Sequence, residues 1–133
     1  MVIANTLALC LNATPDSVRR ARREVAEVAE SAGMSAGAID DVRLCVNEAV
    51  ANAVVHAYRE EPGAVDLVVD VDDAHMRVVV RDHGVGLTSQ MSARNGYGLR
   101  LMEALAEGFA IGAAPGGGTE VRMAFRLSAR PSP

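Results

Sequence analysis

The sequence predicts an α+β fold, a two-layer α/β sandwich in which helices cover one face of a mixed β-sheet. Three observations lead to this prediction. Along the 133 residues, the apolar patterns follow the order β-α-α-β-β-α-β-β. The helical stretches repeat apolar residues every three or four positions, whereas the strand stretches are short and are followed by turn residues. No internal repeat or linker interrupts the chain, so we expect a single domain over residues 1–133, with a frayed tail at residues 128–133.

The first elements expected are one strand and one helix. Residues 2–11 have the apolar and β-branched character of a strand. Thr14 then fits a helix N-cap, Pro15 the first helical position and Gly33 the helix end. The polar face of this helix is rich in arginine and glutamate, which predicts a solvated face with i,i+4 ion pairs; a face that docks a partner is the alternative.

A second, longer helix is expected next. It begins near Ser35 or Ala38 and runs to about Tyr58, where the segment at residues 60–63 breaks it. Its buried stripe consists of small and β-branched residues at helical spacing, namely Ile39, Val42, Val46, Ala49, Val50, Ala53 and Ala57.

Two strands follow, over residues 64–71 and 76–82, with an acidic turn between them. The aspartates within residues 70–73 are reminiscent of a calcium loop, but the glycine and the final glutamate of an EF-hand are missing. We therefore expect hairpin-turn chemistry at residues 72–75, with His75 as a surface residue. The remaining elements are a glycine-punctuated loop, a third helix and two strands, at residues 83–95, 96–107, 109–113 and 119–127.

Composition excludes several kinds of function. A formal net charge of −4, two Tyr, two Phe and no Trp argue against a nucleic-acid-binding surface. All 13 basic residues are arginines, so a Schiff base and a P-loop lysine are excluded. We expect no signal peptide, because the N-terminus has no basic residues and its apolar residues are interrupted by Asn5 and Thr6. We expect no membrane span, because no stretch approaches about 20 apolar residues. Cys10 and Cys45 lie in apolar patterns, which indicates reduced, packed thiols in a cytoplasmic protein.

The second helix places polar side chains along one stripe. Glu48, Asn52 and His56 stand at i, i+4 and i+8, so they stack turn upon turn. A carboxylate in such a stripe can act as a general base, and an amide oxygen suits Mg²⁺. A solvated polar stripe would explain the same spacing.

A carboxylate followed by two glycines stands at the end of the strand 76–82. Asp82 can accept a hydrogen bond from an exocyclic amine, while Gly84 and Gly86 allow a ligand to approach the backbone closely. Taken by itself, this pattern also fits a turn that an aspartate caps.

Two further glycine motifs follow. Gly96 and Gly98 lead directly into the third helix, where free N–H groups and the positive helix end suit a phosphate. The Rossmann pattern is not matched, because Leu101 stands three residues after Gly98. The run that ends in Gly118 and Thr119 fits an ordinary hairpin loop when considered by itself.

In this order and at these separations, the four motifs resemble the ATP-binding boxes of the GHKL superfamily, which includes gyrase, histidine kinases and MutL. The motifs span residues 41–125. Within that superfamily the chain resembles the anti-sigma-factor serine kinases of the SpoIIAB/RsbW type. This closer resemblance rests on the segment 46–58, on the lack of a phospho-accepting histidine helix and on a length that is nearly all ATPase domain. It implies the Bergerat, or GHKL ATPase, fold.

The resemblance also implies a role for each motif. Glu48 would be the base that takes a proton from a serine hydroxyl, and Asn52 would hold Mg²⁺ against the phosphates. Asp82 would bond the adenine amine, with support from Thr119. The glycine motifs would shape the pocket floor through Gly84 and Gly86, and would present N–H groups to phosphate at Gly96, Gly98 and Leu99.

The function implied by this resemblance is that of an ATP- and Mg²⁺-dependent serine-protein kinase that also binds a sigma factor. It would phosphorylate an anti-sigma factor antagonist of the STAS type and form a homodimer. Nine residues separate Gly86 from Gly96, which is a short lid for such a site. A catalytically inactive, ATP-responsive binding module is therefore the alternative. Arg94 and Arg100 are the nearby cations, and for His56 we expect a structural hydrogen bond.

Overall fold

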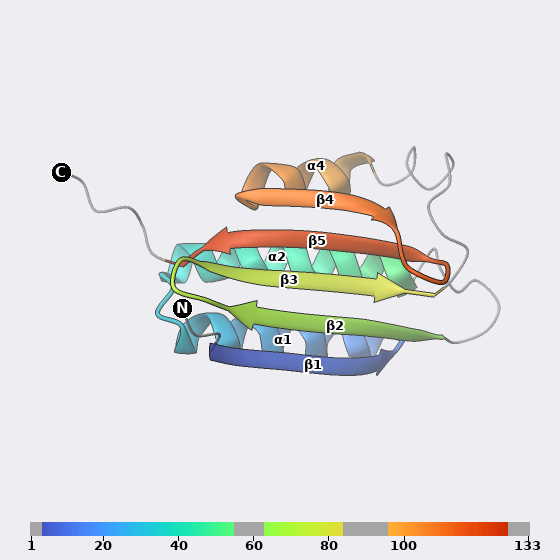
Figure 1. The fold of residues 1–133 in the computed structure, drawn as a ribbon, viewed down its shortest axis with the longest axis horizontal. Helices are drawn as coiled ribbons and strands as arrows, with labels where there is room; N and C mark the ends of the chain where they lie inside the picture. The colour runs from blue at the N-terminus through green and yellow to red at the C-terminus, as the bar shows by residue number, and fades with distance from the viewer. Residues whose placement is uncertain (1–3, 55–62, 84–95, 128–133) are drawn as a thin grey trace.

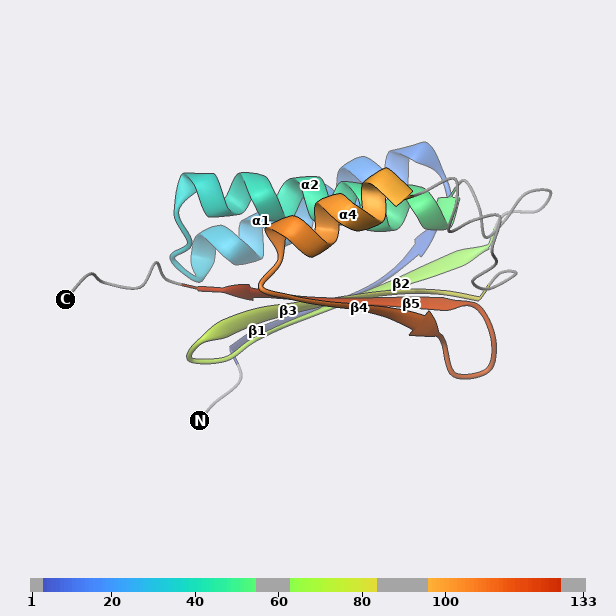
Figure 2. The same cartoon turned by 90° about the horizontal axis from the view of Figure 1, so that it is seen from above.

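The computed structural model describes residues 4–54, 63–83 and 96–127, which form a five-stranded sheet with three helices on one of its faces (Figures 1 and 2). The strands are β1 (Ala4–Asn12), β2 (Ala64–Val71), β3 (His75–Asp82), β4 (Gly108–Ala113) and β5 (Thr119–Arg126). The helices are α1 (Pro15–Ser31), α2 (Ala36–Asn52) and α4 (Gly96–Leu105). The predicted two-layer α+β sandwich is confirmed.

The prediction of a mixed sheet is wrong for the strands that the structure describes. Their order is β1-β2-β3-β5-β4, and every neighbouring pair is antiparallel (Figure 1). Between β1 and β2 the chain runs back along α1 and forward again along α2, so β2 starts at the end of the sheet where β1 finishes. The single helix α4 does return the chain so that β4 runs parallel to β3, but β5 lies between those two strands.

The helix signals in the sequence are confirmed at four positions. Thr14 is the N-cap of α1 and Pro15 occupies the first turn, while Gly33 follows the helix with φ of +86°. Ser35 is the N-cap of α2, and its side chain accepts a hydrogen bond from the N–H of Ala38 at 3.2 Å. The predicted end of this helix near Tyr58 lies outside the described residues. None of the described helices is long and apolar enough to cross a membrane.

The acidic turn between β2 and β3 is a hairpin turn, as predicted. The side chain of Asp72 accepts hydrogen bonds from the N–H groups of Ala74 and His75, each at 2.9 Å. The ring of His75 is bonded to the carboxylate of Glu107, so His75 links the turn to the start of β4 and is more than a surface residue.

The core lies between the sheet and the helices. Alternate residues of β2 and β3 point into it, because successive strand residues face opposite sides of a sheet. The small and β-branched stripe predicted for the second helix supplies the opposite wall, with Val42, Val46 and Val50 fully buried. Figure 2 shows that the other face of the sheet is left uncovered by helices.

Candidate functional site

The carboxylate predicted to act as a base lies against the backbone of a glycine predicted to bind phosphate. Glu48 is half-buried on α2, one turn before Asn52. A methyl group built on Gly98, in the first turn of α4, would lie only 2.6 Å from Oε1 of Glu48. Two motifs separated by 49 residues of sequence therefore meet where α2 packs against α4.

The start of α4 is suited to bind an anion. The helix begins at Gly96 and has ten residues, and its first N–H groups have no acceptor within the helix. Gly98 is buried, and Leu99 packs partly against the hydrophobic core. A positive helix end next to a carboxylate side chain can hold a phosphate while a base acts beside it.

Asp82 and Thr119 form the second part of the site. The register of β3 and β5 pairs Arg81 with Glu120, so the next residues outward are Asp82 and Thr119. The N–H of Thr119 donates to Oδ1 of Asp82 at 3.2 Å, and the two residues are only 5% and 7% exposed. The structure thus brings together two predicted site residues that lie 37 positions apart.

Gly118 makes this close approach of strands possible. Its φ of +92° is one that L side chains rarely adopt. A methyl group built on it would lie 2.0 Å from the carbonyl oxygen of Asp82, closer than any real contact. Only glycine at this position lets β5 begin beside the end of β3. The loop that looked ordinary in the sequence is therefore needed to build the site.

Several predicted residues lie outside the part of the chain that the structure describes. They are Gly84, Gly86, His56, Arg94 and the short lid between Gly86 and Gly96. Arg100 is described and is exposed on α4. The described site consequently has two parts, one at Glu48 and Gly98 and the other at Asp82 and Thr119.

The two cysteines differ in their surroundings. Cys45 is fully buried on α2, and burial, reinforced by the carboxylates of Asp41 and Glu48, raises the pKa of its thiol to about 12. This thiol is packed, as predicted. Cys10 is exposed, contrary to the prediction, because it alternates along β1 with Leu9 and Leu11, which face the core.

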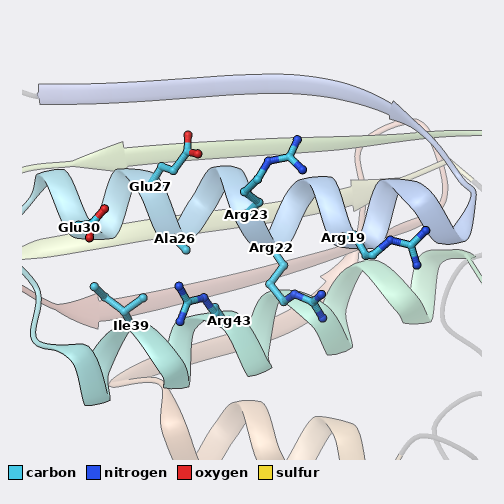
Figure 3. Close-up of a pocket in the computed structure, with 8 residues that line it drawn as sticks. All are labelled: Arg19, Arg22, Arg23, Ala26, Glu27, Glu30, Ile39 and Arg43. Atoms are coloured by element: carbon cyan, nitrogen blue, oxygen red, sulfur yellow. The ribbon is translucent and has the colours of Figure 1, made fainter.

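A groove of about 450 Å³ between α1 and α2 contains none of the predicted site residues (Figure 3). Arg19, Arg22, Arg23 and Arg43 line it, and Arg22 reaches across to donate a hydrogen bond to Oδ1 of Asn47 at 3.0 Å. Arg19 and Arg43 pair with aspartates on their own helices. Three of the four guanidinium groups thus have a partner within the protein. On α1 itself, Arg19 pairs with Asp16 and Arg20 pairs with Glu24 at i,i+4, which fits the solvated, ion-paired face predicted for this helix.

The motifs did not identify Glu120, which is buried beside Thr119 and contacts two arginines. Glu120 could be recognised by its charge, which is opposite to that of Arg81, but the two residues lie on strands that become neighbours only after folding. Sequence spacing alone does not reveal such a pair, because the register of β3 and β5 is needed to place Glu120 opposite Arg81.

Comparison with known proteins supports the same interpretation. Residues 11–125 match the family described as Histidine kinase-like ATPase domain. An anti-sigma F factor of Clostridium acetobutylicum is 28% identical over 92% of this chain and 94% of its own. An anti-sigma F factor of Pasteuria penetrans is 33% identical over 68% of this chain and 70% of its own. The serine-protein kinase RsbW of Listeria innocua is 31% identical, over 74% of each chain.

A solved structure extends the comparison to three dimensions. It contains the RsbU and RsbW domains of a Mycobacterium tuberculosis protein, and it superposes with a TM-score of 0.76 at 28% sequence identity. The similarity covers 97% of this chain and 34% of the solved one, so this chain spans about a third of the length of the solved chain.

Proposed function

Because this chain belongs to the family of histidine kinase-like ATPase domains, we propose that it is an ATP-binding anti-sigma factor and serine-protein kinase of a partner-switching system. It binds a sigma factor, and it transfers the γ-phosphate of ATP to a serine of an anti-sigma factor antagonist. The observation that carries this proposal is the position of Glu48, whose carboxylate lies against Gly98 at the start of α4.

One part of the site binds the adenine of the nucleotide, and the other part binds its phosphates. At one end, the carboxylate of Asp82 accepts a hydrogen bond from the adenine amine, while Thr119 supports that carboxylate through its N–H. At the other end, the N–H groups of Gly96, Gly98 and Leu99 donate to phosphate oxygens at the positive end of α4. Gly84 and Gly86, which lie outside the described residues, complete the pocket floor in this proposal.

The chemistry asked of the protein is a proton transfer. Glu48 takes the proton of the incoming serine hydroxyl as the serine oxygen forms a bond to the γ-phosphorus. The bond between the γ-phosphorus and the bridging oxygen breaks, and ADP leaves. Without a lysine in the chain, the α4 N–H groups and Arg100 are the described donors available to stabilise phosphate charge.

Mg²⁺ fits the oxygen donors that α2 presents. Asn52 offers an amide oxygen, a hard ligand of the type that Mg²⁺ prefers, one helical turn from Glu48, whose carboxylate is left to act as the base. When bound, the ion would neutralise phosphate charge. No group of three His, Cys, Asp or Glu side chains among the described residues could hold a metal ion. In this proposal, phosphate oxygens and water supply the remaining ligands.

The partners and the assembly form part of the proposal. We propose an antagonist of the STAS type, a homodimer and a cytoplasmic location, with residues 1–133 as a single domain. Figure 2 shows one face of the sheet without helices, and strand alternation places the half-buried Val68, Val79 and Ala124 on that face, which supports a homodimer. Light scattering of the purified chain tests it, and a monomer at all concentrations would contradict it.

Phosphoryl transfer tests the kinase proposal directly. The purified chain is mixed with γ-labelled ATP, Mg²⁺ and a cognate antagonist, and label on the antagonist is measured. Glu48→Ala should abolish transfer while ATP binding largely persists, because the carboxylate acts on the serine and not on the nucleotide. Glu103→Ala, which removes an exposed carboxylate on α4, is the matched control and should leave transfer unchanged.

The outcomes separate the two candidate functions. Label transfer that depends on Glu48 supports the kinase. ATP binding without transfer, in a wild-type chain with an intact Glu48, would instead support the ATP-responsive binding module. A chain that binds neither ATP nor ADP at millimolar concentration would contradict both.

A further inference from the structure

Buried polar side chains are concentrated at one point of the fold. In the described part of the chain, four residues with polar or charged side chains are buried, namely Ser17, Asp82, Thr119 and Glu120. The last three are neighbours where β3 ends and β5 begins. Asp82 and Thr119 belong to the proposed nucleotide site, whereas Glu120, the next residue of β5, points to the opposite face of the sheet.

Glu120 joins the two strands on that opposite face. Its Oε2 accepts hydrogen bonds from Nε of Arg81 at 2.8 Å and from Nη2 of the same guanidinium. Its Oε1 accepts from Nε of Arg122 at 2.6 Å. These hydrogen bonds hold the pKa of Glu120 below its ordinary value, and the bond from Arg81 has the largest effect. The carboxylate is therefore ionised at neutral pH, and both of its oxygens are occupied.

The hydrogen bonds of Glu120 to Arg81 and Arg122 lie at the end of the backbone pairing between β3 and β5. The last pair in register is Arg81 with Glu120, and three glycines with positive φ precede Thr119. Beyond that pair, the N–H of Thr119 donates to the side chain of Asp82 rather than to a strand carbonyl. The distance between Asp82 and Thr119 thus depends on how firmly the preceding pair is held.

We propose that Glu120 is a positioning residue for the base-binding end of the nucleotide site, acting through Arg81 to hold Thr119 against Asp82. This inference rests on the proposed function, because it takes Asp82 as the acceptor for the adenine amine. Glu120 touches neither the nucleotide nor the serine. Without Glu120, Thr119 is held less firmly against Asp82, whereas the phosphate-binding start of α4 is unchanged.

The test measures base binding and phosphate binding separately. Dissociation constants for ATP, GTP and tripolyphosphate are determined by titration calorimetry on the full chain and on Glu120→Gln. We expect the affinity for ATP to fall ~10-fold, the effect of one charge-assisted hydrogen bond, and that for tripolyphosphate to change less than ~2-fold. The preference for ATP over GTP should fall with the affinity for ATP.

Glu107→Gln is the matched control. Glu107 is likewise a carboxylate held by two side chains, those of His75 and Arg126, but at the other end of β3 and β5. It should leave the preference for ATP unchanged even if it lowers the thermal unfolding temperature by a similar amount. A simple loss of fold stability would affect both variants alike, so the comparison isolates positioning.

Three outcomes would overturn the inference. The first is a folded Glu120→Gln with an unchanged ratio of ATP to tripolyphosphate affinity, and the second is an equal loss in Glu107→Gln. If Glu120→Gln does not fold, Arg122→Gln, which removes a largely exposed arginine, replaces it in the test, and its affinity for ATP should fall ~3-fold. An unchanged affinity for ATP in Arg122→Gln is the third outcome. Asp82→Asn separates the two proposals: if it leaves ATP affinity unchanged, the proposed base site itself is wrong.

Discussion

At the scale of single residues, one glycine decides where the candidate base lies. The carboxylate of Glu48 occupies the space that a side chain at position 98 would need. The atom in the way is the far end of a flexible side chain, so a larger residue at position 98 displaces the carboxylate without forcing apart the backbones of α2 and α4. Activity and stability are therefore expected to respond differently to the same substitution.

Gly98→Ala should leave the protein folded and impair phosphoryl transfer. The new methyl group pushes Oε1 of Glu48 away from a position 2.6 Å distant, and a displacement of about 1 Å at a reacting group lowers the rate by roughly 100-fold. Thermal unfolding and transfer of labelled phosphate measure the two effects. Gly37→Ala, another helical glycine but with open space around it, is the control and should retain full activity. Equal rates for both variants would contradict the position assigned to Glu48.

The sequence predicted Glu48 and Asn52 from their spacing on one helix, and Asp82 and Thr119 from the order of the motifs, but it did not predict Glu120. Glu48 and Asn52 could be predicted because a helix fixes i and i+4 on one face. Glu120 could not, since its role depends on Arg81, which lies 39 positions away and comes opposite only through strand pairing. Cys10 is exposed because successive residues of β1 face opposite sides of the sheet. The apolar residues in this stretch do not alternate regularly with polar ones, so the sequence did not indicate which of them face the core.

At the scale of elements, the connection before β5 is the most constrained part of the described site. Gly116, Gly117 and Gly118 all have positive φ, but only Gly118 lies against another strand. The sequence predicted a hairpin loop here and both of its strands. It did not predict that the sheet would be antiparallel throughout, because strand direction depends on the number of helices between strands and on which strands become neighbours.

Gly118→Ala should destabilise the protein far more than Gly116→Ala. Both changes incur the strain of a side chain at positive φ, about 1–3 kcal/mol. At position 118 the methyl group also meets the backbone of Asp82 and His83, which has no flexible end to give way, whereas nothing lies within 4 Å at position 116. Urea unfolding measures the difference between the variants. If they lose the same free energy of unfolding, the close approach of Gly118 to β3 is wrong.

At the scale of the whole molecule, carboxylates in contact with arginines tie the ends of the sheet together. Asp72 pairs with Arg77 beside the turn between β2 and β3, and Glu107 pairs with Arg126 and His75 at the same end. At the other end, Glu120 joins β3 to β5. In each case the hydrogen bonds lower the pKa of the carboxyl group. The acidic residues of a chain with net charge −4 thus also serve as structural links.

Acid should therefore unfold this protein by protonating those links. Glu107 and Glu120 have pKa values in the folded state below their ordinary value of 4.5, so the stability they contribute is complete above that value. It is lost as the pH falls from about 4.5 through their folded-state pKa values. Thermal unfolding temperatures measured between about pH 3 and pH 7 should decline over the acid half of that range.

Glu120→Gln should be less stable than the wild type at pH 7 and should lose less stability on acidification, because its side chain has no proton to gain. Glu103→Gln removes an exposed carboxylate that has no ion-pair partner among the described residues, and its pH curve should run parallel to that of the wild type. If the curve of Glu120→Gln also runs parallel to the wild type, the buried carboxylate between Arg81 and Arg122 is not one of the groups that set acid stability.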